Sequence, residues 1–172
     1  MKILALDQAA VTTGWAIFDK KKLVNSGSFT VKKTLPIEVR LHQIQQNILD
    51  VIYNNFGDDN PDMIIFEGIQ QQSNVETFRK LAMVQAAILL LCYNLDIKYV
   101  IYSPSEWRAI NGGGYGRKRE EQKNAAIIKA KEWYQVDVDS DIADAINIGH
   151  AYLINRTNDK SNAAFGKWTT NH

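Results

Sequence analysis

The 172-residue sequence has one cysteine, three prolines and three histidines. A single cysteine excludes a disulfide framework, and Cys92 lies in an apolar run, so we expect it to be a core thiol. His42, His150 and His172 lack the spacing of zinc ligands. The richest apolar run, Leu81 to Tyr93, is too short to cross a bilayer. The single cysteine, the spacing of the histidines and the lack of a long apolar run therefore argue against a disulfide-stabilised, zinc-bound or membrane-spanning protein.

The sequence also lacks a large net charge and a secretory signal. The formal net charge is +1, which does not by itself indicate a nucleic-acid partner. A nearly neutral total can still conceal a basic face beside an acidic pocket. At the N-terminus, Lys2 precedes only a few apolar residues before Asp7, unlike a signal peptide. We expect one cytoplasmic domain, residues 1–157, followed by a polar tail, residues 158–172. Basic residues cluster at 20–22, 32–33, 79–80 and 117–119.

Apolar periodicity predicts an α/β fold with a mixed five-stranded sheet and helices on both faces. Three strands come first and form an antiparallel meander; the later two are each reached through a helix and are expected to be parallel to the first. The predicted strands are residues 2–7, 15–18, 29–31, 63–66 and 97–102. The predicted helices are residues 34–55 and 77–93, one that begins at 117–119, and one from 141 to about 155 with Ser140 as its N-cap.

Two of the predicted strands end in an acid, the first at Asp7 and the fourth at Glu67. The end of a central strand is a rigid support for a metal ligand, although aspartate is also common in turns. Asp141 and Asp144 stand three residues apart, so they share one face of the last predicted helix. If that helix crosses the sheet beside these strand ends, all four acids converge.

Converging carboxylates repel one another and take up protons, and divalent cations relieve that repulsion. Oxygen ligands suit Mg²⁺ or Mn²⁺. Two such ions about 4 Å apart can activate a water and stabilise the leaving oxygen of a phosphodiester. The four acids therefore predict a site for two Mg²⁺ or Mn²⁺ ions. Asp137 and Asp139 are expected in a solvated loop, but they are the rivals of Asp141 for this role.

Three segments carry a resemblance that covers about residues 1–152. The first is Ile3–Asp7 followed by Thr13–Ile17, the second is Pro61–Glu67, and the third is Asp141–Ile146 followed by His150. Tyr102-Ser103-Pro104 and a glycine-rich loop before Lys118 match in the same order. Together these segments resemble the RuvC-type Holliday-junction resolvases of the ribonuclease H-like, or retroviral-integrase, superfamily. The small size of the chain suggests a phage member.

The resemblance implies a homodimer that binds a four-way DNA junction, each subunit cutting one strand by metal-assisted hydrolysis. A phage-encoded member would act in the host cytoplasm. Asp7, Glu67, Asp141 and Asp144 carry over as the catalytic metal ligands. His150 is expected to be a core residue or a group that holds a metal ligand in place, and a direct ligand role is the lesser alternative.

The resemblance also suggests DNA contacts. Lys118 or Arg119 matches the family's basic residue at the start of the third helix, and Arg108 matches a phosphate-facing one. At the start of that helix, Arg117, Lys118 and Arg119 would oppose the helix dipole, which favours a role on DNA phosphates. Tyr115 in the glycine-rich loop either stacks on a base or covers the edge of the sheet.

The chain departs from the family pattern at two places. Asp7-Gln8-Ala9 stands where relatives often have Asp-Pro-Gly, which changes the turn after the ligand. Where cellular relatives carry an aromatic residue that stacks on a base at the crossover, this chain has Gln70. Base stacking contributes about 1–3 kcal/mol, so we expect a relaxed sequence preference.

Three other functions stay open at this point. A nuclease of the same fold could act on RNA or on non-junction DNA, and cleavage of a four-way junction against an RNA/DNA hybrid separates these substrates. A non-catalytic junction-binding protein would show no Mg²⁺-dependent cleavage. An actin-like nucleotide-binding domain would need a second phosphate-binding hairpin, for which the chain is too short.

Overall fold

The computed structural model describes residues 1–70 and 74–158. The predicted tail, residues 158–172, lies outside these residues except for Asn158, the last residue of the final helix. Within the described ranges, no helix combines the length and apolar character that a membrane span needs.

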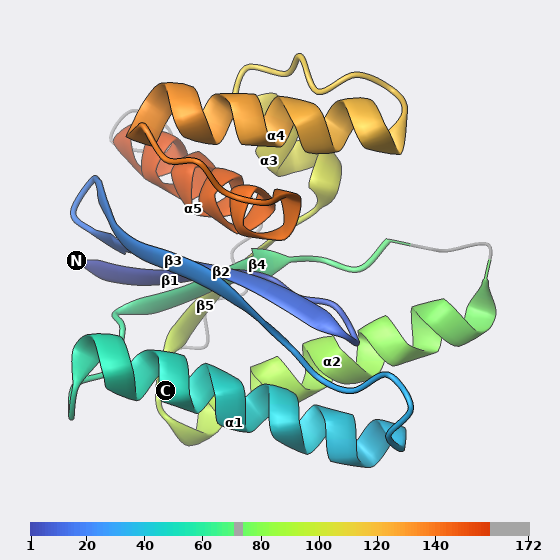
Figure 1. Cartoon of the computed structure of the whole chain (residues 1–172). Coiled ribbons are helices and arrows are strands. Elements are labelled where there is room, and N and C mark those ends of the chain that lie inside the picture. Colours follow the sequence, from blue (N-terminus) through green and yellow to red (C-terminus); the bar gives the residue numbers. More distant parts are fainter. Residues whose placement is uncertain (71–73, 159–172) are drawn as a thin grey trace.

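As predicted, the five strands form one mixed sheet, and their order is β3-β2-β1-β4-β5 (Figure 1). The central strand β1 pairs antiparallel with β2 and parallel with β4, and β5 is parallel to β4. The edge strand β3 is much longer than the predicted 29–31, because it pairs with β2 along its whole length through residues that are mostly polar. The strands are β1 (Lys2–Asp7), β2 (Thr12–Asp19), β3 (Lys22–Thr30), β4 (Met63–Glu67) and β5 (Lys98–Tyr102).

The helices include one that the sequence analysis missed. They are α1 (Ile37–Phe56), α2 (Val75–Asn94), α3 (Pro104–Ile110), α4 (Arg119–Tyr134) and α5 (Ser140–Asn158). The missed helix, α3, begins with a capping box: Ser103 Oγ accepts from Glu106 N, and Glu106 Oε2 accepts from Ser103 N. The N-cap of α5 is Asp139 rather than Ser140, because Asp139 Oδ1 accepts the backbone N–H groups of Asp141 and Ile142.

Each face of the sheet has its own core. Helices α1 and α2 cover one face, and α3, α4 and α5 cover the other (Figure 1). Alternation along β1 sends Leu4 and Leu6 to the first face and Ile3 and Ala5 to the second. Cys92 is 1% exposed in the core under α1 and α2, as predicted.

Helix α5 approaches the sheet very closely at its first turn. A Cβ on Gly14 of β2 would lie only 2.0 Å from the backbone oxygen of Asp141. Gly14 also pairs with Asp7 across the β1–β2 ladder. Glycine at this position therefore allows the start of α5 to rest beside the end of β1.

Candidate active site

Two of the four predicted acids lie side by side at the end of the sheet. Strands β1 and β4 are parallel with Ala5 opposite Ile65 and Leu6 opposite Phe66. Extending this register by one residue sets Asp7 beside Glu67, at the carboxyl ends of both strands. Neighbouring strands are about 4.8 Å apart, and alternation turns both carboxylates to the α5 side. The opening beyond the carboxyl ends of parallel strands is a usual place for a binding site.

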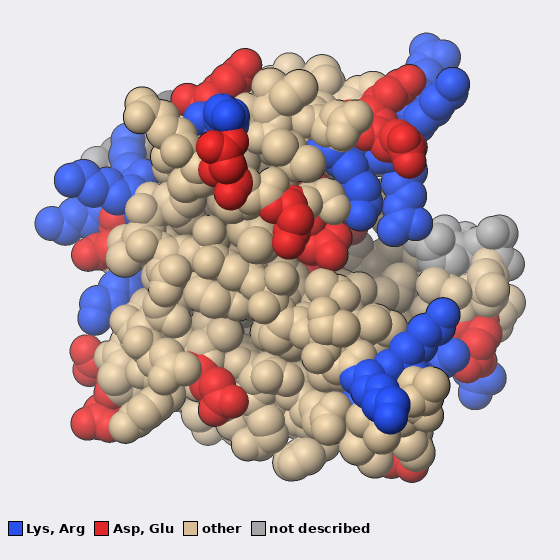
Figure 2. Space-filling model, in the orientation of Figure 1, with Lys and Arg blue, Asp and Glu red and all other residues tan. Residues whose placement is uncertain are grey.

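Helix α5 brings the other two acids to the same place. Asp141 and Asp144, one turn apart, line a hollow together with Asp7 and Glu67. The hollow measures about 760 Å³, far more than a cation alone requires. Figure 2 shows it as a recess in the surface, with Lys and Arg side chains along one rim and acidic side chains close by. The four acids therefore share one pocket that is large enough for part of a polymer.

Burial and neighbouring charges change the pKa values of three of these acids. Burial and the charges of Asp144, Glu67 and Asp141 raise the pKa of Asp7 well above its usual value. Burial and the charge of Glu67 raise the pKa of Asp144 to about 7. Burial also raises the pKa of Glu67, against the opposing effects of the Trp107 hydrogen bond and the Arg108 charge. A bound divalent cation would offset the burial and the mutual repulsion that raise these pKa values.

The carboxylates share a pocket but do not form a closed cage. In residues 1–70 and 74–158, no three acidic, histidine or cysteine side chains are grouped tightly enough to hold one metal ion. Their donor chemistry nevertheless fits a hard divalent cation, since all four offer carboxylate oxygens and Asp7, Glu67 and Asp144 resist ionisation where they lie. For these carboxylates to share one ion, their oxygens would have to lie closer together than they do in the described residues.

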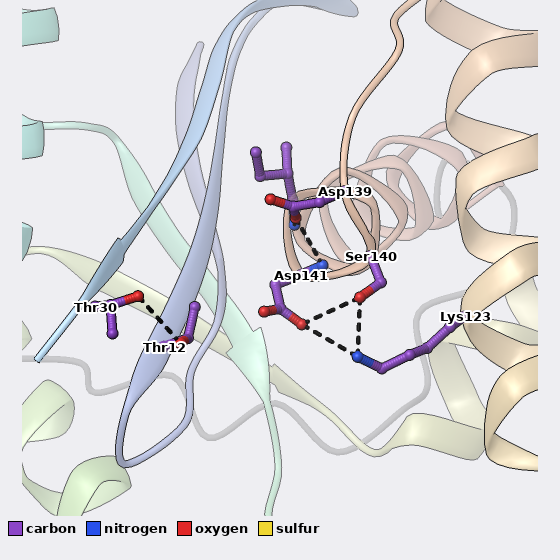
Figure 3. A network of polar contacts seen from close by, with 7 residues as sticks. Thr12, Thr30, Lys123, Asp139, Ser140 and Asp141 are labelled. Carbon is purple, nitrogen blue, oxygen red and sulfur yellow. Dashed lines mark hydrogen bonds and ion pairs between the residues drawn. The ribbon is translucent and has the colours of Figure 1, made fainter. Parts of the chain in front are cut away.

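A lysine that the sequence analysis did not single out lies at the same pocket. Lys123 Nζ, from the second turn of α4, is 3.5 Å from Asp141 Oδ1 and 2.9 Å from Ser140 Oγ (Figure 3). Its charge lowers the pKa of both Asp7 and Asp144. Among the basic residues of α4, only those at its start were predicted to contact DNA. Finding Lys123 requires knowing that α4 packs along α5.

Comparison with known proteins identifies the family of this chain. The sequence profile of the family described as "Crossover junction endodeoxyribonuclease RuvC" matches residues 3–151. The chain belongs to the RuvC family. The RuvC of Halothermothrix orenii is 26% identical over 164 residues, covering 91% of this chain and 96% of that protein. The RuvC of Wigglesworthia glossinidia brevipalpis is 29% identical over 157 residues, covering 89% of this chain and 94% of that protein.

Solved structures support the same fold at lower sequence identity. Thermus thermophilus RuvC in complex with Holliday junction substrate has a TM-score of 0.72 and 14% identity, covering 91% of this chain and 96% of that one. The yeast mitochondrial Holliday junction resolvase Ydc2 has a TM-score of 0.61 and 15% identity, covering 92% of this chain and 80% of that one. The predicted ribonuclease H-like architecture is thereby confirmed.

Of the basic residues predicted for this RuvC-family chain, some reach the pocket. Arg108, Arg117 and Arg119 line it, as does the exposed Gln70. Lys118 lies at the N-cap of α4, where its backbone N–H donates to Glu121 Oε2, and it does not line the described pocket. Between the two residues that matched the family's basic position, Arg119 is therefore the one beside the acids.

The base-stacking prediction for Tyr115 is wrong. Its side chain is only 4% exposed, so neither face of the ring is free for a base. The hydroxyl donates to Asn147 Oδ1 on α5, and Asn111 Nδ2 donates to that hydroxyl. The ring meets Trp107 edge-on, with the centroids 5.2 Å apart. Tyr115 therefore fastens the glycine-rich loop to the core.

Three remaining candidates have structural roles. His150 stacks on Trp133 at 3.9 Å and shares a 2.6 Å hydrogen bond with the Tyr134 hydroxyl, and burial lowers its pKa to about 4. It is a core histidine and does not line the described pocket. Asp137 pairs with Lys131, and Asp139 caps α5. Neither rival of Asp141 lines the pocket as described.

Proposed function

We propose that the chain is a structure-selective endonuclease that resolves four-way DNA junctions by hydrolysing one phosphodiester bond in each of two strands. One observation carries the proposal: Asp7 and Glu67 stand in register at neighbouring strand ends, directly facing the Asp141 and Asp144 helix. Membership of the crossover junction endodeoxyribonuclease family supports it. A homodimer follows from the symmetry of the substrate, because paired cuts in a junction require two equivalent sites.

The proposed site uses two divalent cations, Mg²⁺ or Mn²⁺. Asp7 with Asp141 or Asp144 would hold one ion, and Glu67 would hold the other. When bound, such ions activate the attacking water and stabilise the departing oxygen of the phosphodiester. The chain's own carboxylates supply the negative charge that attracts the ions. Hydrolysis would leave 5′-phosphate and 3′-hydroxyl ends.

Basic side chains at the rim would hold the DNA backbone over the acids. Positively charged side chains line the pocket, and phosphate contacts provide most of the affinity of such proteins. These side chains are Arg108, Arg117, Arg119 and Lys123. These basic side chains also offset the repulsion between the carboxylates and the DNA phosphates. Gln70 has no ring to stack on a base, so the predicted relaxed sequence preference belongs to this proposal.

The proposal is tested by cleavage of an immobile four-way junction with and without Mg²⁺, next to a linear duplex and an RNA/DNA hybrid. We expect Mg²⁺-dependent, paired cuts in the junction only. Asp7→Asn should bind the junction as the wild type does and cut at least about a thousandfold more slowly, equivalent to about 4 kcal/mol of barrier.

Three results would contradict the proposal. Preferential cleavage of the hybrid would favour the ribonuclease alternative, and binding without cleavage would favour a passive junction-binding protein. Loss of binding together with cleavage in a well-folded Asp7→Asn variant would show that Asp7 has another role. A panel of junction cores tests the relaxed preference, which a strict tetranucleotide consensus would refute.

A further inference from the structure

The indole of Trp107 donates its only hydrogen bond to one of the predicted metal ligands. Trp107 Nε1 lies 2.8 Å from Glu67 Oε2. Trp107 is fully buried and stands first among the largest buried side chains in the described residues. A buried indole N–H needs an acceptor, and a carboxylate is a stronger acceptor than a neutral group. The Trp107 contact therefore fixes the orientation of the Glu67 carboxylate.

Two further side chains pack against the indole ring. Tyr115 meets it edge-on at 5.2 Å, and the Arg108 guanidinium lies 4.7 Å from the ring centroid. Tyr115 is in turn tied to Asn147 of α5, one turn beyond Asp144. Rings packed in this way have little freedom to rotate. Trp107 is thus a rigid connection between Glu67 and the helix that carries the other two acids.

A second contact holds the backbone of the same glutamate. Gln8 Nε2 donates to the backbone oxygen of Glu67, and Gln8 is only 8% exposed. Gln8 stands in the turn after Asp7, where the sequence departs from the Asp-Pro-Gly of relatives. Glu67 is therefore fastened at its main chain to the end of β1 and at its carboxylate to α3.

We propose that Trp107 is a positioning residue that holds the Glu67 carboxylate in the orientation required for a divalent cation. The inference rests on the proposed function and deepens it. With Oε2 accepting the indole N–H, Oε1 is the oxygen that we assign to the cation. Trp107 touches neither the ion nor DNA and acts only through Glu67. Partners that orient a metal ligand typically change metal affinity or activity by about 10–100-fold when they are removed.

Trp107→Phe tests the inference, because phenylalanine keeps an aromatic ring but has no N–H. We expect the Mn²⁺ dissociation constant, measured by calorimetry without DNA, to rise about tenfold or more. The Mn²⁺ concentration for half-maximal junction cleavage should shift in parallel. Adding Trp107→Phe to Glu67→Gln should have no further effect on Mn²⁺ affinity. The inference is overturned if folded Trp107→Phe binds Mn²⁺ as the wild type does.

Tyr115→Phe is the matched control. It removes a buried hydroxyl from the other side of the same packing and leaves the indole–carboxylate bond intact. We expect this variant to lose stability but to lower Mn²⁺ affinity much less than Trp107→Phe does, because Glu67 keeps its indole hydrogen bond. An equal loss of Mn²⁺ affinity in both variants would mean that general loosening of the core, and not the N–H group, is responsible.

A measurement on the wild type keeps the inference testable if Trp107→Phe does not fold. The Nε1–H resonance of Trp107 can be assigned by replacing the other three tryptophans in turn. We expect Mg²⁺ to shift it in the wild type and not in Glu67→Gln. A resonance that stays still while the protein binds Mg²⁺ overturns the inference. If the wild type binds neither Mn²⁺ nor Mg²⁺, the proposed function itself has failed.

Discussion

The two faces of the sheet are built from different kinds of side chain. Under α1 and α2 the core consists mainly of aliphatic and aromatic residues such as Ile48, and the buried polar residues on this side include Arg40. Under α3, α4 and α5 the core also contains hydrogen-bonded polar side chains, namely Asn111, Tyr115 and Asn147. One face is bound together mainly by apolar packing, and the other also by directed polar contacts.

A polar group in a core costs free energy unless its donors and acceptors find partners, and those partners must be in fixed positions. The polar network therefore restricts how this core can repack. It also holds α3, the glycine-rich loop and α5 in a defined arrangement. That arrangement sets where Asp141 and Asp144 stand relative to Asp7 and Glu67. We infer that the apolar face mainly determines stability, and that the polar face mainly determines the geometry of the acids.

Gly14→Ala is expected to have the largest effect on the polar face. The new Cβ would lie 2.0 Å from the backbone oxygen of Asp141, so the first turn of α5 has to move away from β1. Overpacking of this kind costs about 1–3 kcal/mol of stability. A displacement of about 1 Å at reacting groups costs about a hundredfold in rate. Single-turnover junction cleavage should therefore fall by about that factor in the folded variant.

Ile48→Ala is the counterpart on the apolar face. Ile48 is fully buried against the sheet, and its truncation should lower the free energy of unfolding in urea by about 2–5 kcal/mol. The cleavage rate of the remaining folded protein should not change. Equal losses of rate in Ile48→Ala and Gly14→Ala would refute the division between the faces.

The polar face should also give stability a pH dependence. Burial raises the pKa of Asp144 from 3.8 to about 7 and that of Asp7 well above its usual value. A raised pKa in the folded state means that the stability contribution is complete below the ordinary pKa and is lost as the pH rises through about 7. For the metal-free protein, we expect a loss of up to about 1.4 kcal/mol per pH unit for each such carboxyl.

His150 works in the opposite direction, because its lowered pKa means that its contribution is lost as the pH falls from 6.5 to about 4. The informative quantity is therefore the difference between the wild type and Asp144→Asn, measured by urea unfolding from about pH 5 to pH 8. Asp144→Asn should become the more stable protein as the pH rises. A difference that stays constant over this range would show that Asp144 is ionised at the lower pH.

The sequence predicted best those elements whose signal is local. The strands that end at Asp7 and Glu67 are uninterrupted apolar runs, and their acids mark where each run stops. Strand β3 was predicted too short because its pairing with β2 depends on backbone hydrogen bonds, which polar residues make as well as apolar ones. The capping box of Ser103 and Glu106 was visible, but seven residues give too little periodicity to indicate α3.

The candidate site was predictable in its acids and not in the contacts that hold them. Asp141 and Asp144 follow from helical spacing, and the strand ends follow from the parallel register. Tyr115 and Lys123 depend on residues of α5, Asn147 and Asp141, that are distant in the sequence. Such contacts form only when α4 and the glycine-rich loop pack on α5, so no local sequence pattern indicates them.

The smallest expected effect concerns the rim of the polar face. Lys123 is 3.5 Å from Asp141 and both side chains are more than a third exposed, so their ion pair should contribute no more than about 1 kcal/mol to stability. Its larger role in our proposal is toward DNA phosphates. Lys123→Gln should weaken junction binding and lower the salt dependence of the binding constant by about one phosphate contact.

Lys131→Gln provides the matched comparison on the same helix. Lys131 also pairs with an aspartate, Asp137, at 2.5 Å, but it is exposed and does not line the pocket in the described residues. We expect its loss to leave the slope of binding against salt concentration unchanged. If Lys123→Gln and Lys131→Gln reduce that slope equally, the positive charge acts through the whole helix and not at the rim. If neither changes it, DNA approaches the acids by another route and Lys123 serves only to neutralise Asp141.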